Sequence, residues 1–127
     1  MRIEHVALNV GDPAGMAKWY VENLEFRIVR SSDGAPYAHF LADGNGVVLE
    51  LFNNTEAAFP DYASLDPNSL HIAFLVDDME AVRGKLLAAG ATPEGGVLTT
   101  EAGDQLAFLR DPWKVTVQLV KRQKSLV

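Results

Sequence analysis

The feature that most constrains this chain is an internal repeat. Residues 3–10 read IEHVALNV and residues 69–76 read SLHIAFLV, so a histidine twice opens a short apolar stretch with the same order of residues. Each stretch is followed within two residues by an aspartate. Self-similarity of this kind indicates one supersecondary unit used twice. We therefore divide the chain by its repeat before assigning single elements.

Each copy continues with a helical pattern. In the first copy Asp12 can cap a helix whose first position is Pro13. In the second copy an aspartate again precedes the pattern, and Gly90 supplies the C-terminal stop. The apolar stripes that these helices would bury are Met16, Trp19 and Tyr20 in the first, and Met79, Val82, Leu86 and Ala89 in the second.

Each predicted helix is followed by strands. FLAD, GNG and VVLEL form one hairpin pattern from Phe40, and FLRD, PWK and VTVQL form the other from Phe108. A polar residue, Glu50 or Gln118, stands ten positions after the phenylalanine in both copies. With one more strand near residues 26–30 and another near 92–100, each unit is expected to be a strand, a helix and three strands.

Length sets the domain organisation. A chain of 127 residues has the size of one domain. Residues 53–69 contain two prolines and no sustained period, so they are expected to connect the copies or to cover a site. The prediction is a single domain over 1–127 with a first module at 1–52, a linker at 53–69, a second module at 70–120 and a tail at 121–127.

Composition excludes several classes of function. The net charge is −6, which argues against nucleic acid or an anionic membrane as a partner, since both need clustered Lys and Arg. There is no cysteine, so a disulfide framework, a thiolate metal site and a cysteine nucleophile are impossible. No apolar run approaches the length of a membrane span, and the N-terminus does not read as a signal peptide, so we expect a cytoplasmic protein.

Strand parity isolates four polar side chains. Alternate residues of a strand face opposite sides, and the apolar side must pack on the helix. The first strand of each copy then places a histidine, and the last strand a Glu or Gln, on the face away from the helix. These residues are His5, Glu50, His71 and Gln118.

A carboxylate inside an apolar strand is costly unless it is paired or bound to a cation. If the two sheets curl toward each other, these four residues converge, and two imidazoles, a carboxylate and an amide oxygen suit a divalent first-row metal. Taken singly, each residue has a simpler reading: a hydrogen-bonded histidine, a rim glutamate paired with an arginine, or a satisfied core amide. The matching positions across the repeat favour the metal site.

At these residues the chain resembles the vicinal oxygen chelate superfamily, which includes glyoxalase I, extradiol dioxygenases and bleomycin resistance proteins. The resemblance covers roughly residues 3–120 and is carried by IEHVALNV, WYVENLEF, LHIAFLV, LLAAGA, VVLELF and FLRDPWKVTVQLV. It implies an α+β fold of two βαβββ modules, whose mixed sheets form a cupped half-barrel around a metal. It also implies that His5, Glu50, His71 and Gln118 hold a divalent ion such as Ni, Zn, Mn or Fe.

The chain departs from the family pattern at three places. Leu-Gly-Phe is here Leu24-Glu25-Phe26, which is expected to change only a turn, and Asp-Pro-x-Gly is Asp111-Pro112-Trp113-Lys114, which is expected to place an aromatic at the rim. The last ligand position, commonly the glutamate base, is Gln118. The resemblance then implies a lyase or isomerase in which Glu50 is the catalytic base and the metal stabilises an enediolate.

Two other functions stay open. His5, His71 and Glu50 also supply the two-His-one-carboxylate set of an extradiol-type dioxygenase with Fe(II). Without metal, the cup could bind an apolar or aromatic small molecule, such as an antibiotic, against an aromatic wall. The candidate substrate-binding residues are Tyr37, His39, Phe52 and Trp113.

The substrate itself is not fixed by any motif. A glutathione or coenzyme A thioester would need cationic anchors, and the sequence does not place its candidates, Arg27, Arg30, Arg83 and Arg110. The expected partner is a small molecule, with no nucleic acid and no membrane. The resemblance further implies a homodimer.

Overall fold

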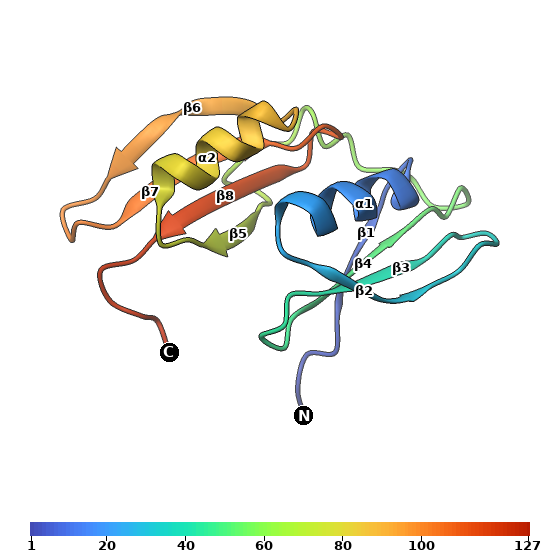
Figure 1. The fold of residues 1–127 in the computed structure, drawn as a ribbon. Coiled ribbons are helices and arrows are strands. Elements are labelled where there is room, and N and C mark those ends of the chain that lie inside the picture. Colours follow the sequence, from blue (N-terminus) through green and yellow to red (C-terminus); the bar gives the residue numbers. More distant parts are fainter. The chain divides into compact units, whose positions relative to one another are not determined.

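The computed structural model describes residues 1–127, which divide into two compact units, Met1–Pro60 and Asp61–Val127. The boundary falls inside the predicted linker, and residues 53–69 contain turns but no helix or strand. Each unit has one helix and one four-stranded sheet, and the helix lies across one face of its sheet (Figure 1). The predicted α+β fold of two βαβββ modules is confirmed.

The elements of the two units correspond one to one. The first unit contains β1 (Val6–Asn9), α1 (Pro13–Asn23), β2 (Arg27–Ser31), β3 (His39–Ala42) and β4 (Val48–Phe52). The second unit contains β5 (Ile72–Leu75), α2 (Met79–Ala88), β6 (Thr92–Thr99), β7 (Gln105–Arg110) and β8 (Thr116–Lys121).

Both sheets have the same mixed topology. The strand orders are β1-β4-β3-β2 and β5-β8-β7-β6, in which the first and last strands of each unit are parallel neighbours. The other pairs are antiparallel. A parallel pair needs a long crossover, and here the helix and two further strands provide it. His5 and His71 each stand one residue before the first strand of their unit, rather than in it as predicted, and this pairing brings that strand beside the one that carries Glu50 or Gln118.

Both helices begin at the predicted aspartates. Asp12 accepts a hydrogen bond from the backbone of Gly15 at 3.0 Å, with Pro13 at the first helical position, and Asp78 accepts one from Ala81 at 3.0 Å. α2 ends before Gly90, whose φ of 105° suits a residue without a side chain. Neither helix is long and apolar enough to span a membrane.

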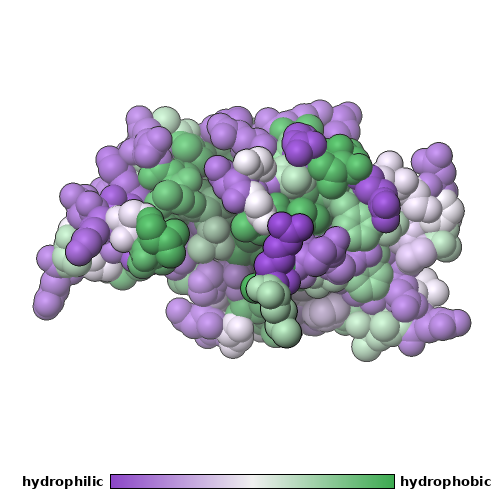
Figure 2. All heavy atoms as spheres, turned by 90° about the horizontal axis from the view of Figure 1, so that it is seen from below, coloured by the Kyte–Doolittle hydropathy of each residue, from purple (hydrophilic) through white to green (hydrophobic).

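The core of each unit lies between the helix and the sheet. Tyr20 and Met16 of α1 are fully buried against β3 and β4, and Leu86 of α2 is fully buried in the second unit. The sheet positions facing the helices are equally buried, as parity predicts: Leu8, Leu41, Leu49 and Leu51 in the first unit, and Leu109, Val117 and Leu119 in the second. Apolar side chains also reach the surface beside hydrophilic ones, as Figure 2 shows in a view from below.

The two turns that depart from the family pattern keep the backbone that glycine would provide. Glu25 has φ 59° and Lys114 has φ 73°, both in the left-handed region that disfavours a Cβ atom. Glu25 leads from α1 into β2, and Lys114 stands between β7 and β8. Both turns are therefore retained, and the backbone strain is confined to Glu25 and Lys114.

Candidate metal centre

In the first unit His5 and Glu50 lie side by side. Glu50 pairs with Ala7 of β1 and with Phe40 of β3, so these three side chains share the face away from α1. His5 stands two residues before Ala7 and extends over the same face. Its Nε2 atom lies 3.2 Å from Oε2 of Glu50.

This spacing suits two ligands of one divalent ion. Nitrogen and oxygen ligands of zinc lie about 2.0–2.2 Å from the metal, which puts two tetrahedral ligand atoms roughly 3.3 Å apart. The Glu50 side chain is only 18% exposed, so its charge needs a cationic partner, whether an ion or a protonated His5. The residues present in this unit fit a metal ion.

His5 has a second acidic neighbour. Its Nδ1 atom contacts the carboxylate of Glu4, and this hydrogen bond is the main reason that the pKa of His5 is raised above 6.5. Desolvation opposes the rise in pKa, and the charges of Glu4 and Glu50 add to it. A carboxylate on the far nitrogen of a metal-binding histidine orients the ring and raises its basicity.

The second unit repeats this arrangement with a neutral residue. Gln118 pairs with Ala73 of β5 and with Phe108 of β7, so it occupies the place that Glu50 has in the first unit. Nδ1 of His71 donates to the backbone carbonyl of Pro67 at 2.7 Å. A neutral ring that donates from Nδ1 keeps the lone pair on Nε2, which is the form that binds a metal.

Both histidines rest against a phenylalanine in the same way. The ring centroids of His5 and Phe40 are 5.6 Å apart and those of His71 and Phe108 are 5.2 Å apart, each pair close to perpendicular. Polar residues alone did not predict these aromatic partners. The signal was present, because each phenylalanine stands ten positions before Glu50 or Gln118.

Neither unit by itself gathers three or more His, Cys, Asp or Glu side chains into one cluster. His5 contacts Glu50 in the first unit, and His71 and Gln118 hold the corresponding positions in the second. The assignment of all four residues to one ion stays a prediction.

The predicted substrate-binding residues occupy different environments. Phe52 follows Glu50 on the same face of β4, and Tyr37 is exposed at the β2–β3 connection. His39 pairs with Leu51, so it lies on the face opposite to Glu50, and its Nδ1 donates to the carbonyl of Tyr37. Trp113 lies in the turn between β7 and β8, where its backbone donates to Asp111. Their contacts with a substrate stay predictions.

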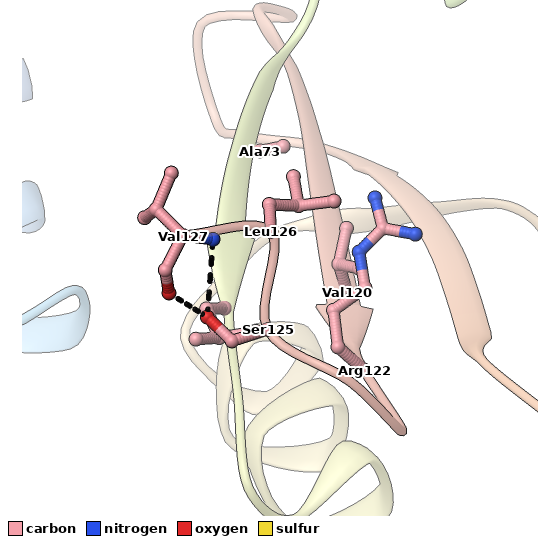
Figure 3. Close-up of a pocket in the computed structure, with 7 residues that line it drawn as sticks. Ala73, Val120, Arg122, Ser125, Leu126 and Val127 are labelled. Carbon is pink, nitrogen blue, oxygen red and sulfur yellow. Dashed lines mark hydrogen bonds between the residues drawn. The ribbon is translucent and has the colours of Figure 1, made fainter.

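A cavity of about 260 Å³ lies on the Gln118 face of the second unit (Figure 3). Its apolar lining comes from two strands and the tail: Ala73 and Leu75 of β5, Val120 of β8, and Leu126 and Val127. Arg122 and Ser125 are its polar residues. The tail thus lines a largely apolar cavity next to a proposed ligand.

Comparison with known proteins identifies the family. The family model described as Glyoxalase/Bleomycin resistance protein/Dioxygenase superfamily matches residues 2–119. The chain belongs to this superfamily. Glyoxalase superfamily members are similar to it in sequence: a protein named "Probable lactoylglutathione lyase" from Vibrio parahaemolyticus is 29% identical, over 98% of this chain and 93% of that protein.

Solved structures of other proteins share the fold of this chain. A glyoxalase family protein from Enterococcus faecalis has a TM-score of 0.65 and 26% identity, over 94% of this chain and 96% of that one. An antibiotic binding protein from a Streptomyces species has a TM-score of 0.68 and 21% identity, over 97% of each chain. The same fold therefore carries proteins of different function.

Proposed function

We propose that this chain is a divalent-metal-dependent lyase or isomerase of the glyoxalase type, acting on a small substrate with two neighbouring oxygen atoms. The observation that carries the proposal is the approach of His5 Nε2 to Glu50 Oε2 at 3.2 Å on one face of the first sheet. The relatives named lactoylglutathione lyase, at 27–29% identity over 98% of the chain, support this reaction class.

In this proposal four residues hold the ion, which is Ni, Zn, Mn or Fe. His5 and His71 would bind the ion through Nε2, Glu50 through a carboxylate oxygen and Gln118 through its amide oxygen. A bound divalent ion supplies a Lewis acid that stabilises negative charge on the substrate oxygens. With a single carboxylate ligand, the charge of the centre is +1, which favours an anionic intermediate.

Glu50 is the proposed base. It takes a proton from the carbon next to the substrate carbonyl, and the bonding electrons move onto the carbonyl oxygen to give an enediolate. Returning the proton to the former carbonyl carbon, while the hydroxyl proton moves from one substrate oxygen to the other, completes the isomerisation with no net change in protons or electrons. Gln118 cannot take this role, because an amide does not accept a proton at neutral pH.

Elemental analysis tests the ligand set. The wild type is expected to bind close to one ion per set of four ligands, and the His5→Ala/His71→Ala double variant is expected to lose it. His39→Ala is the matched control, because it removes the third histidine from the opposite face of the sheet. Absence of bound metal after incubation with each ion contradicts the proposal.

Turnover tests the reaction. Methylglyoxal with glutathione is the first substrate pair to assay, and Glu50→Gln is expected to abolish its conversion. Turnover that survives this substitution contradicts the assignment of the base. Oxygen uptake with catechols and Fe(II) indicates the dioxygenase alternative instead.

A second candidate function is metal-free binding of an apolar small molecule. The 260 Å³ cavity lined by Leu126 and Val127 favours it, as does the fold shared with an antibiotic binding protein. Saturable binding of an apolar fluorescent probe that persists with chelator, and is lost in Val120→Asp, supports this candidate. The homodimer stays a prediction, which light scattering of the purified protein checks.

A further inference from the structure

The sheet of the first unit carries an unbroken row of paired positions from β1 to β2. Ala7 pairs with Glu50, Glu50 with Phe40, and Phe40 with Arg30. Side chains at paired positions of neighbouring strands lie on the same face. Arg30 therefore shares its face with Glu50, two strands away, at a Cα separation of about 10 Å.

A β-bulge brings a second arginine onto this face. Arg27 pairs with Ala42, which is on the Phe40 side of β3, and the register shifts between Ile28 and Arg30. In a regular strand, residues three apart point to opposite sides. The extra residue at the bulge places both arginines on the Glu50 face, while Ile28 pairs with Leu41 on the helix side. Bulges commonly re-aim side chains in this way near active sites.

These two arginines are free, unlike others in the chain. Arg110 binds Glu94, and Arg122 binds Asp104. The side chains of Arg27 and Arg30 are exposed and form no hydrogen bond or ion pair. Charged residues on an edge strand can serve only to prevent aggregation. That role requires outward charge, but it does not require a bulge that turns both guanidinium groups toward the ligand face.

The second unit does not repeat this feature. Glu94 pairs with Phe108 and so occupies the place of Arg30, and its carboxylate is bound to Arg110. Two free cations beside the proposed ligands are thus specific to the first unit. Because the chain as a whole carries a charge of −6, a local cationic pair is needed to attract an anion to this face.

We propose that Arg27 and Arg30 recognise an anionic group, a carboxylate or a phosphate, at the end of the substrate remote from its reacting oxygens. This inference rests on the proposed function, since it takes Glu50 as the reactive end. Guanidinium groups bind carboxylate and phosphate through paired, charge-assisted hydrogen bonds. The spacing of Arg30 from Glu50 selects extended small molecules, with the anion roughly 10 Å from the reacting oxygens.

Calorimetric titration of the full chain with S-methylglutathione, its diethyl ester and coenzyme A tests the proposal. S-methylglutathione offers carboxylates, the ester has none, and coenzyme A offers phosphates. The wild type is expected to bind one of the two anions at least about tenfold more tightly than the ester. Arg27→Gln/Arg30→Gln is expected to remove that preference. Lys18→Gln, which removes a cation from the exposed side of α1, is expected to keep it.

The outcomes separate this inference from the proposed function. The double variant is expected to keep its metal content and to have a higher KM, whereas absence of metal or of turnover in the wild type contradicts the proposed function alone. Equal binding of acid and ester, an unchanged preference in the double variant, or no binding of either anion overturns the anion site. If the double variant loses affinity for S-methylglutathione, the recognised group is a carboxylate. If it loses affinity for coenzyme A, the group is a phosphate.

Discussion

The ring of His5 packs edge-on against Phe40, and in the second unit His71 packs in the same way against Phe108. Each phenylalanine is also the cross-strand partner of the next proposed ligand, Glu50 or Gln118. One aromatic ring per unit therefore contacts the histidine and pairs with the residue on the neighbouring strand. This arrangement restricts the histidine to few rotamers before a metal binds.

Phe40→Leu and Phe108→Leu are each expected to weaken metal binding several-fold, because the histidine ring loses its support. The lost edge-to-face contact is worth about 0.5–1.5 kcal/mol. Metal titration calorimetry measures the affinity, and thermal unfolding measures the stability. Phe26→Leu, a core change on the helix side, is the control that should lower stability alone. Equal metal affinity in all three variants contradicts the support role.

Gln118→Glu is expected to tighten metal binding by about tenfold or more, because a carboxylate replaces a neutral amide as the fourth ligand. It would also provide a second base. If Glu50 is the base in the wild type, Glu50→Gln/Gln118→Glu should recover part of the turnover that Glu50→Gln loses. Competition with a metal-binding dye measures the affinity. Unchanged affinity in Gln118→Glu places residue 118 outside the ligand set.

Element order and strand parity could be predicted from the sequence because they depend on local signals. Asp12 and Pro13 start α1, and the alternation around Glu50 already separates the buried face from the other one. The family pattern likewise indicated a turn at Glu25, but the change expected there does not occur, since Glu25 adopts the φ of 59° that glycine would favour. These features are set by residues within a few positions of each other.

Features that depend on strand register could not be predicted. The face of His39 follows from its pairing with Leu51, and the shared face of Arg27 and Arg30 follows from a bulge in the pairing of β2 with β3. A shift of one residue in either register would reverse these assignments. The sequence carries no local signal that fixes them.

Glu25→Gly and Lys114→Gly are each expected to stabilise the protein by about 0.5–1 kcal/mol. Both residues have φ in the left-handed region, where a Cβ atom costs about 1–2 kcal/mol and glycine gives back part of that in chain entropy. Urea unfolding measures the change. Glu22→Gly, within α1, is the control and should be destabilising. A loss of stability at both turn positions contradicts the assignment of strain.

The pKa of His5 is expected to fall toward its ordinary value in Glu4→Gln, because the Glu4 carboxylate is the main cause of the rise. In the metal-free protein, folding favours the protonated form of the His5 ring, because the pKa of His5 is raised. The contribution of His5 to stability is therefore full below pH 6.5 and is lost as the pH rises through the raised pKa. A metal ion must displace the proton of the His5 ring. The apparent metal affinity should therefore rise as the pH rises from 6.5 through the raised pKa of His5.

An NMR titration of the His5 ring protons, with Glu22→Gln as a control on exposed α1, checks this expectation. Thermal unfolding between pH 5 and 9 follows the stability. An unshifted titration in Glu4→Gln would show that Glu4 does not hold the ring in solution.

Arg110→Met is expected to destabilise the second unit by about 2–3 kcal/mol. The buried guanidinium donates to the carbonyls of Tyr62 at 2.6 Å and Leu65 at 2.8 Å and to Glu94 at 2.5 Å, so it fastens the linker to β7. The carbonyl of Pro67, two residues beyond Leu65, holds Nδ1 of His71. Loosening the linker should therefore break the hydrogen bond that keeps the proton of His71 on Nδ1. The ¹⁵N NMR shifts of the ring report which nitrogen carries the proton. The control is Arg122→Met, which removes a partly exposed arginine bound to Asp104 and should leave the His71 tautomer unchanged. If His71 keeps its tautomer in Arg110→Met, the linker does not position its ring.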